Sequence, residues 1–178
     1  MSPAKDDGLA CAVSSVPEII MNGGDDRFSP LINRPRNSKP DEEAAKTTTI
    51  TSDGETFEEI PPMPVGLNYH CAVALEGGDL FVTGGDSRPL VPGINNNGTT
   101  FLYHADTTEW EALPDMPTPR VGLQCARVLN EAGEQEVIAA GGFYENVVEI
   151  FHLPSRQWRT GKSNSTLAYS NISILQGL

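Results

Sequence analysis

Three side chains that can bind metals or take part in redox chemistry stand together at Tyr69-His70-Cys71. Phenolate, imidazole and thiolate groups are all ligands that copper accepts. Successive side chains of an extended strand point to opposite sides, so His70 is expected to face away from Tyr69 and Cys71. The triplet also lacks a second histidine that converges on the same point. We therefore expect no copper site at this position.

The other two histidines, His104 and His152, each follow an aromatic residue, Tyr103 and Phe151 respectively. Matching positions in neighbouring repeats would lie too far apart to share one metal ion through bonds of about 2 Å. We interpret both as surface histidines of strands. The chain contains no GxSxG, HExxH, phosphate-binding loop or dinucleotide fingerprint. We therefore expect no catalytic residue, no metal and no cofactor.

The three cysteines, Cys11, Cys71 and Cys125, are odd in number and lack CxxC spacing. This pattern predicts neither a disulfide framework nor a zinc site. Each cysteine is followed by alanine and preceded closely by Gly-Leu, so the three occupy matching positions of a repeat. Matching positions are expected to point the same way in successive repeats. The prediction is three buried free thiols, because free cysteine behaves as a small hydrophobic residue.

The elements that position these residues are short strands, most clearly between Val121 and Thr160. Alternating and apolar runs bounded by turn residues predict four strands in this stretch. Their expected bounds are Cys125–Leu129, Glu136–Ala140, Val147–His152 and Gln157–Thr160. The second run ends at a Gly doublet, and the third and fourth place Phe151 seven positions before Trp158.

The same pattern occurs three times in the chain. A Gly doublet ends an apolar run at Gly23-Gly24, Gly84-Gly85 and Gly141-Gly142, with first glycines 61 and 57 residues apart. An aromatic or apolar residue then stands seven positions before a second one, as Ile50 and Phe57, Tyr103 and Trp110, and Phe151 and Trp158. A repeat of 50 to 60 residues with these markers is close to the length of a kelch blade, about 50 residues.

On these residues the chain resembles the kelch-repeat family, in the superfamily of galactose oxidase and kelch-like propellers. Residues 8 to 178 carry the resemblance, and the first repeat departs from it because Ile50 and Phe57 replace Tyr and Trp. The resemblance implies an all-β fold: a partial β-propeller of about three four-stranded antiparallel blades plus the first strand of a fourth. Because propellers typically need 4 to 8 blades to close, we expect the chain to be a fragment of a longer protein.

The expected organisation follows the three repeats. A polar leader occupies residues 1–7, and blade 1 occupies residues 8–64 with a long loop insertion at 25–46. Blade 2 occupies residues 65–117 and blade 3 residues 118–162. Residues 163–178 are expected to start an incomplete fourth blade.

The chain is acidic, with 24 Asp and Glu against 12 Lys and Arg and a formal charge of -12. This charge argues against nucleic acid and anionic membranes as partners. The absence of a signal peptide and the unpaired cysteines favour the cytoplasm slightly, whereas three N-glycosylation sequons favour secretion, so the compartment stays open.

Connectivity predicts where a partner would bind. In a four-stranded antiparallel blade, the loop between the second and third strands lies on the same face as the linker from the preceding blade. This rim would present Arg27, Phe28, Arg34, Arg36, Ser87, Arg88 and Arg120. Arginines at such a surface suit a protein partner or an acidic peptide, because guanidinium groups pair with carboxylates. Self-association through open blade edges is also expected.

The expected function is therefore a non-catalytic protein-interaction module. The alternative is a fragment of a galactose-oxidase-like enzyme whose catalytic residues lie outside this chain. Fold alone does not decide between them.

Overall fold

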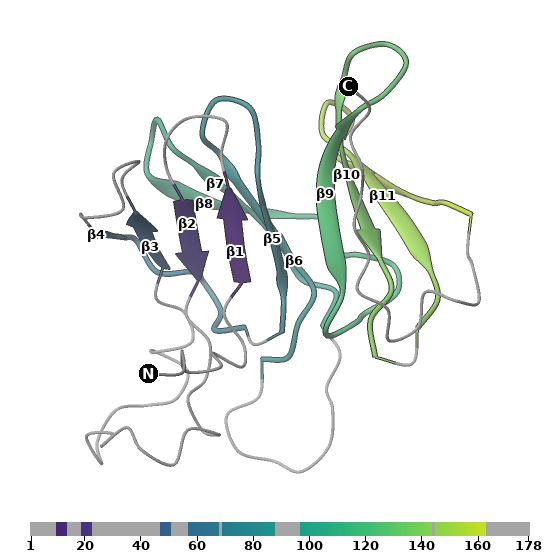
Figure 1. The fold of residues 1–178 in the computed structure, drawn as a ribbon, viewed down its shortest axis with the longest axis horizontal. Coiled ribbons are helices and arrows are strands. Elements are labelled where there is room, and N and C mark those ends of the chain that lie inside the picture. The colour runs from purple at the N-terminus through teal and green to yellow at the C-terminus, as the bar shows by residue number, and fades with distance from the viewer. Residues whose placement is uncertain are drawn as a thin grey trace, which may run out of the picture.

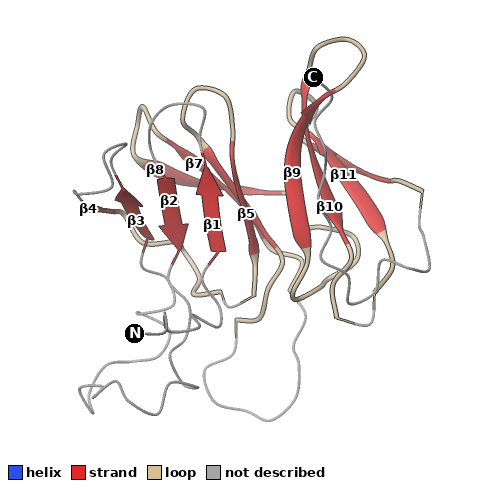
Figure 2. Cartoon of the chain, in the orientation of Figure 1, coloured by secondary structure: helices blue, strands red, loops and turns tan. Residues whose placement is uncertain are grey.

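The computed structural model describes residues 10–13, 19–22, 47–50, 57–67, 69–87, 97–143 and 145–162. These residues form three four-stranded antiparallel sheets, each a simple meander in which sequential strands are neighbours. Figure 2 shows the strands, and the described residues contain no helix. The expected all-β architecture is confirmed. No helix that could cross a membrane is found in this part of the chain.

The first sheet matches the expected first repeat at the level of its backbone. Its strands are β1 (Ala10–Val13), β2 (Ile19–Asn22), β3 (Thr47–Ile50) and β4 (Phe57–Ile60). Ile50 lies directly opposite Phe57 in the register of β3 and β4. The predicted Gly23-Gly24 doublet and the insertion at 25–46 lie outside the described residues.

The second sheet surrounds a strand that is buried on both faces. Its strands are β5 (Cys71–Ala74), β6 (Leu80–Thr83), β7 (Thr100–His104) and β8 (Glu109–Leu113). All four residues of β6, LFVT, are buried, which explains why apolar and polar residues do not alternate along this strand. Leu80 and Val82 pack on one side of the sheet and Phe81 on the other.

The third sheet contains the four strands expected between Val121 and Thr160. They are β9 (Gln124–Leu129), β10 (Gln135–Ala140), β11 (Val148–His152) and β12 (Gln157–Thr160), each within one residue of its expected bounds. The strand expected between Ser165 and Leu175 lies outside the described residues.

The first strands of the three sheets, β1, β5 and β9, lie side by side (Figure 1), and β5 contacts both of the others. Cys71 of β5 and Cys125 of β9 form a disulfide, with Cα atoms 6.0 Å apart. The prediction of free thiols at these two positions is wrong. The first strands β5 and β9 lie close enough for the two cysteines to meet, which the expectation that matching positions face the same way did not allow. The argument for the cytoplasm from unpaired cysteines fails with it. The side chain of Cys11, the third predicted free thiol, lies outside the described part of the chain.

The second and third sheets pack face to face through aromatic side chains. Phe81 lies 5.2 Å from Phe151 and 6.1 Å from Trp158, measured between ring centroids. Within each sheet the expected aromatic pair lies directly opposite across the last two strands: Tyr103 with Trp110, and Phe151 with Trp158. These residues therefore belong to the core or pack on it, as expected.

Each tryptophan also ties its sheet to the linker that enters it. Trp110 Nε1 donates a hydrogen bond of 2.8 Å to the carbonyl of Pro61, and Trp158 Nε1 donates one of 2.9 Å to the carbonyl of Pro114. The repeat seen in the sequence is thus also a repeat of one specific contact. That contact holds the outer edge of each of these two sheets, whereas the disulfide joins their inner edges.

Candidate functional site

The linkers between sheets and the connections between second and third strands meet at one end of the molecule, which we call the loop face. The backbone N–H of Gly85, after β6, donates to the carbonyl of Arg120 at 2.8 Å. The N–H of Phe143, after β10, donates to the carbonyl of Val121 at 2.9 Å. The N–H of Gly122 donates to the carbonyl of Tyr69 at 2.9 Å. The predicted convergence of these segments is confirmed for the described residues.

The Gly doublets allow this close approach. Gly84 has a φ of 73°, and a Cβ atom there would lie 2.9 Å from the carbonyl oxygen of Arg120. Gly142 has a φ of 126°, and its Cβ would lie 3.1 Å from the carbonyl oxygen of Val121. Both positions combine a left-handed backbone with a neighbouring linker, so a side chain would be strained and would push the linker away.

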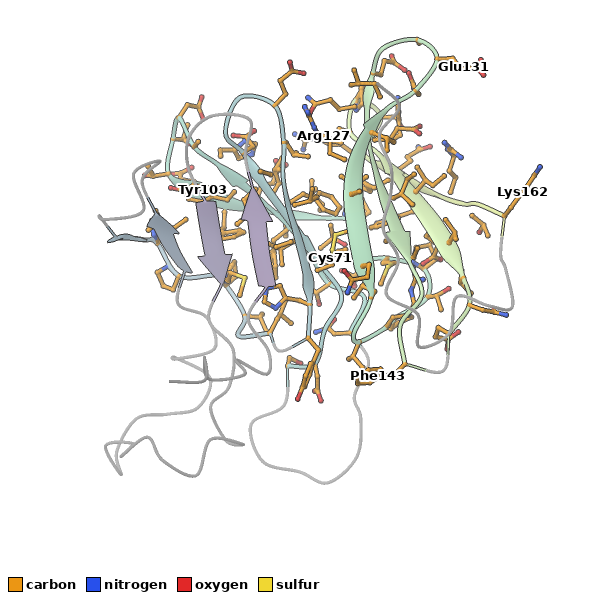
Figure 3. The ribbon with its side chains drawn as sticks, in the orientation of Figure 1. Cys71, Tyr103, Arg127, Glu131, Phe143 and Lys162 are labelled. Carbon is orange, nitrogen blue, oxygen red and sulfur yellow. A yellow bond between two sulfur atoms is a disulfide. The ribbon has the colours of Figure 1, made fainter. Side chains whose placement is uncertain are left out.

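Two aromatic rings are exposed together on the loop face. Tyr69 precedes β5 and is 36% exposed, while Phe143 follows β10 and is 38% exposed. Their ring centroids lie 6.1 Å apart. Figure 3 shows Phe143 at the end of the sheets opposite to Glu131, which lies in the turn between β9 and β10. Val65, in the linker before β5, is a further exposed apolar residue.

The backbone beneath this aromatic pair is held in an unusual conformation. Tyr69 has a φ of 54°, which is uncommon for a residue with a large side chain. The conformation persists because its carbonyl accepts the Gly122 N–H and because Cys71, two residues later, is cross-linked. Strain of this kind costs of order 1–3 kcal/mol and persists where the surrounding structure holds the backbone in place.

His70 holds the segment that carries Tyr69 through a hydrogen bond to Leu67. It is buried, and its Nδ1 lies 3.1 Å from the carbonyl oxygen of Leu67, whereas Nε2 is buried without a hydrogen-bond partner. Burial lowers the pKa of His70 from 6.5 to about 4. The ring is therefore neutral at pH 7, and Nδ1–H donates to Leu67. His70 is buried, Tyr69 is exposed and Cys71 is bonded to Cys125, so the three side chains of this triplet make different contacts.

Arg120 was expected on the exposed rim, and that prediction is wrong. The side chain is fully buried and makes a 2.8 Å ion pair with Glu149 of β11. Its Nη1 also donates to the carbonyls of Gly141, at 3.1 Å, and Val147, at 2.6 Å. Burial lowers the pKa of Arg120, and the charge of Glu149 opposes that shift. Arg120 is thus an internal support of the loop face and is not available to a partner.

The other residues predicted for the rim are divided between the described part and the rest. Ser87 follows β6 on the loop face and is half-buried. The remaining members, Arg27, Phe28, Arg34, Arg36 and Arg88, lie outside the described residues. The exposed pair of Tyr69 and Phe143 was missed, although an aromatic directly after a Gly doublet, as in Gly142-Phe143, is a signal that could have indicated it.

The opposite end of the sheets, which we call the hairpin face, carries a histidine in a triad-like arrangement. His152 Nδ1 lies 2.7 Å from Ser155 Oγ, and Nε2 lies 3.0 Å from a carboxylate oxygen of Glu134. The hydrogen bonds from Asn130 and His152 lower the pKa of Glu134. The backbone N–H of Ser155 also points at Nδ1, at 3.3 Å. Two donors from one residue on one ring nitrogen are typical of a side chain that closes a turn.

The surroundings of His152 fit that structural role. An open pocket of about 290 Å³ lies beside the turn, lined in part by Glu136 and Arg159. These two side chains hydrogen-bond to each other at 2.8 Å, so their charges are compensated. We therefore assign His152 and Ser155 to turn stabilisation, because both the hydroxyl and the backbone N–H of Ser155 contact the same ring nitrogen.

Comparison with known proteins shows the fold. No protein-family model and no curated protein matches the chain. Among solved structures, 135 chains match, so the arrangement is a recurrent one. One is the structure of YjhT, with a TM-score of 0.65 at 12% sequence identity. The alignment covers 92% of this chain and 52% of YjhT, so the chain spans about half the length of that protein.

Proposed function

We propose that this chain is part of a kelch-repeat β-propeller and that it binds a protein partner through its loop face, without catalysis. The family assignment is supported by the repeated markers and the identical contacts they make. In both the second and third sheets, a Gly doublet precedes a cross-strand aromatic pair whose tryptophan bonds to the entering linker. The side-by-side packing of the first strands suits blades arranged around one axis.

The observation that carries the binding proposal is the exposed pair of Tyr69 and Phe143. Aromatic side chains that are exposed, close together and rigidly supported are typical of the centres of protein interfaces. Tyr69 is held by a backbone hydrogen bond and lies next to the disulfide. The Cβ of a residue placed at Gly122 would lie 2.9 Å from the ring of Phe143, so that ring packs closely against the linker. A preorganised surface of this kind loses little entropy when a partner binds.

The partner chemistry follows from what surrounds the pair. The two aromatic rings offer apolar contacts, which favour an apolar or aromatic anchor on the partner. The predicted arginines Arg27, Arg34, Arg36 and Arg88 would add carboxylate recognition at the periphery. Because Arg120 is buried, it does not contribute to the proposed preference for an acidic peptide.

The test compares two exposed positions at opposite ends of the sheets. A Tyr69→Ala, Phe143→Ala double variant removes the loop-face pair, and Leu129→Ala removes an exposed apolar residue at the hairpin-face end of β9. Immobilised wild type and both variants are exposed to the same cell extract and culture medium, and recovered proteins are quantified by mass spectrometry. We expect at least one protein to be recovered by wild type and by Leu129→Ala, and to fall about thirtyfold with the double variant.

Thermal unfolding of all three proteins provides the folding control. If the double variant unfolds at the wild-type temperature and still recovers the same proteins in the same amounts, the loop face is not the binding surface. An equal loss with Leu129→Ala would likewise contradict the proposal.

A further inference from the structure

Three metal-ligating side chains meet on the hairpin face of the second sheet. Asp79 directly precedes β6, His104 ends β7, and Asp106 lies in the turn between β7 and β8. One ligand atom from each lies within 4.8 Å of the other two. Tyr103, labelled in Figure 3, marks the end of β7 where they gather.

The histidine is held in the orientation that a metal ligand needs. His104 Nε2 lies 3.0 Å from a carboxylate oxygen of Glu111, and Nδ1 lies 3.6 Å from Asp79 Oδ2. In the tautomer whose Nε2–H donates a hydrogen bond to Glu111, Nδ1 carries the free lone pair, and Nδ1 is the ring nitrogen beside Asp79. A carboxylate behind the histidine is the arrangement that fixes the tautomer of metal-binding imidazoles.

The distance between Nδ1 and Asp79 suits two ligands of one ion. It is too long for a good hydrogen bond. Two ligand atoms bonded to the same ion at 2.0–2.2 Å and at a tetrahedral angle are about 3.4 Å apart. The carboxylates of Asp79 and Asp106 are each oriented through one oxygen, which accepts the backbone N–H of Ala105 at 2.9 Å and of Thr107 at 2.8 Å respectively.

Support for the histidine extends into the neighbouring sheet. Glu111 also pairs with Arg156, in the turn between β11 and β12.

The third sheet provides a natural comparison that lacks these ligands. In the repeat register His152 matches His104, and Pro154 takes the place of Asp106. Glu136 takes the place of Asp79, but Arg159 already binds it at 2.8 Å. A histidine therefore stands at this position in both sheets. Of these two histidines, His104 has the two aspartates beside it and His152 does not.

We propose that Asp79, His104 and Asp106 bind one divalent transition-metal ion of the Zn²⁺ class, with solvent completing the coordination. One imidazole and two carboxylates suit Zn²⁺ better than Mg²⁺ or Ca²⁺, which prefer oxygen ligands alone. The site lies at the opposite end of the sheets from Tyr69 and Phe143. Metal binding is therefore a separate property from the proposed partner binding, and either proposal can fail without the other.

The test is calorimetric titration of Zn²⁺ into the full chain, freed of metal by chelation and dialysed at neutral pH. A Cys11→Ser background removes the remaining cysteine, which is another possible zinc ligand. We expect one ion per chain, and affinity at least about tenfold lower in His104→Gln and in Asp106→Asn. The matched control His152→Gln should bind as the background protein does. Mg²⁺ and Ca²⁺ at the same concentrations should not displace Zn²⁺.

The Asp106→Asn change separates ligand loss from misfolding, because asparagine keeps an acceptor for the Thr107 N–H. Its unfolding temperature without metal should equal that of the background protein. No binding of Zn²⁺ at millimolar concentration would overturn the proposal. Unchanged affinity in both ligand variants, or an equal loss in His152→Gln, would overturn it as well.

Discussion

Acidification should unfold this protein partly through one residue, His70. The folded state lowers its pKa from 6.5 to about 4, because the buried ring is denied water and Nε2 has no partner. The folded state therefore prefers the neutral ring, and its contribution to stability is complete above pH 6.5. It is lost progressively as pH falls from 6.5 towards 4. At about 1.4 kcal/mol for each pH unit, the full loss is about 3 kcal/mol.

The measurement is urea unfolding of wild type and of His70→Asn between pH 7.5 and 4.5. Asparagine has no titration in this range, and its amide can still donate to the carbonyl of Leu67. We expect the free energy of unfolding of wild type to fall by about 2–3 kcal/mol more than that of the variant. The other two histidines accompany both proteins and cancel in the comparison. Identical pH dependence in the two proteins would refute the claim that His70 is buried and neutral.

The other predictions concern contacts between and within the sheets. Serine at both bonded cysteines should lower the free energy of unfolding by about 4 kcal/mol, because the disulfide closes a loop with a sequence separation of 54. Denaturant unfolding measures this loss, and intact-mass analysis of the alkylated wild type must show the bond, or the prediction fails. Trp158→Phe keeps the ring packing but removes the indole hydrogen bond, so it should cost about 1 kcal/mol in the same assay. Arg120→Met should cost about 3–5 kcal/mol because it leaves Glu149 charged and buried, and an added Glu149→Gln change should recover part of that loss. If Arg120→Met alone is neutral, the buried ion pair has been misassigned.

Contacts within one sheet were predictable from the sequence. Strand periodicity and the seven-residue spacing fix which residues lie opposite each other, so the pair of Phe151 and Trp158 followed from counting alone. The position of the Gly doublets at the end of the second strand was predictable for the same reason, since each doublet ends an apolar run. Their close approach to the linkers is a local consequence of short connections.

Contacts between sheets were not predictable in this way. The disulfide of Cys71 and Cys125 depends on how closely two first strands approach, which periodicity within a sheet does not determine. The burial of Arg120 depends on Glu149, which lies 29 residues later on another element. In the sequence, Arg120 in a linker and Glu149 in a strand both resemble ordinary surface residues. Only the packing of the linker on the third sheet brings the two charges together in a buried place.

The disulfide has a consequence for any partner that touches both Tyr69 and Phe143. These rings come from different sheets. The two sheets are connected at their inner strands by the disulfide, and the hydrogen bond of the Trp158 indole holds the linker at the outer strand. While both bonds are intact, the two sheets cannot separate at either edge. The distance between the two rings is therefore set by bonds that a partner does not contact. A reductant would cleave the disulfide, and the rings would then be free to change their spacing although neither ring had reacted.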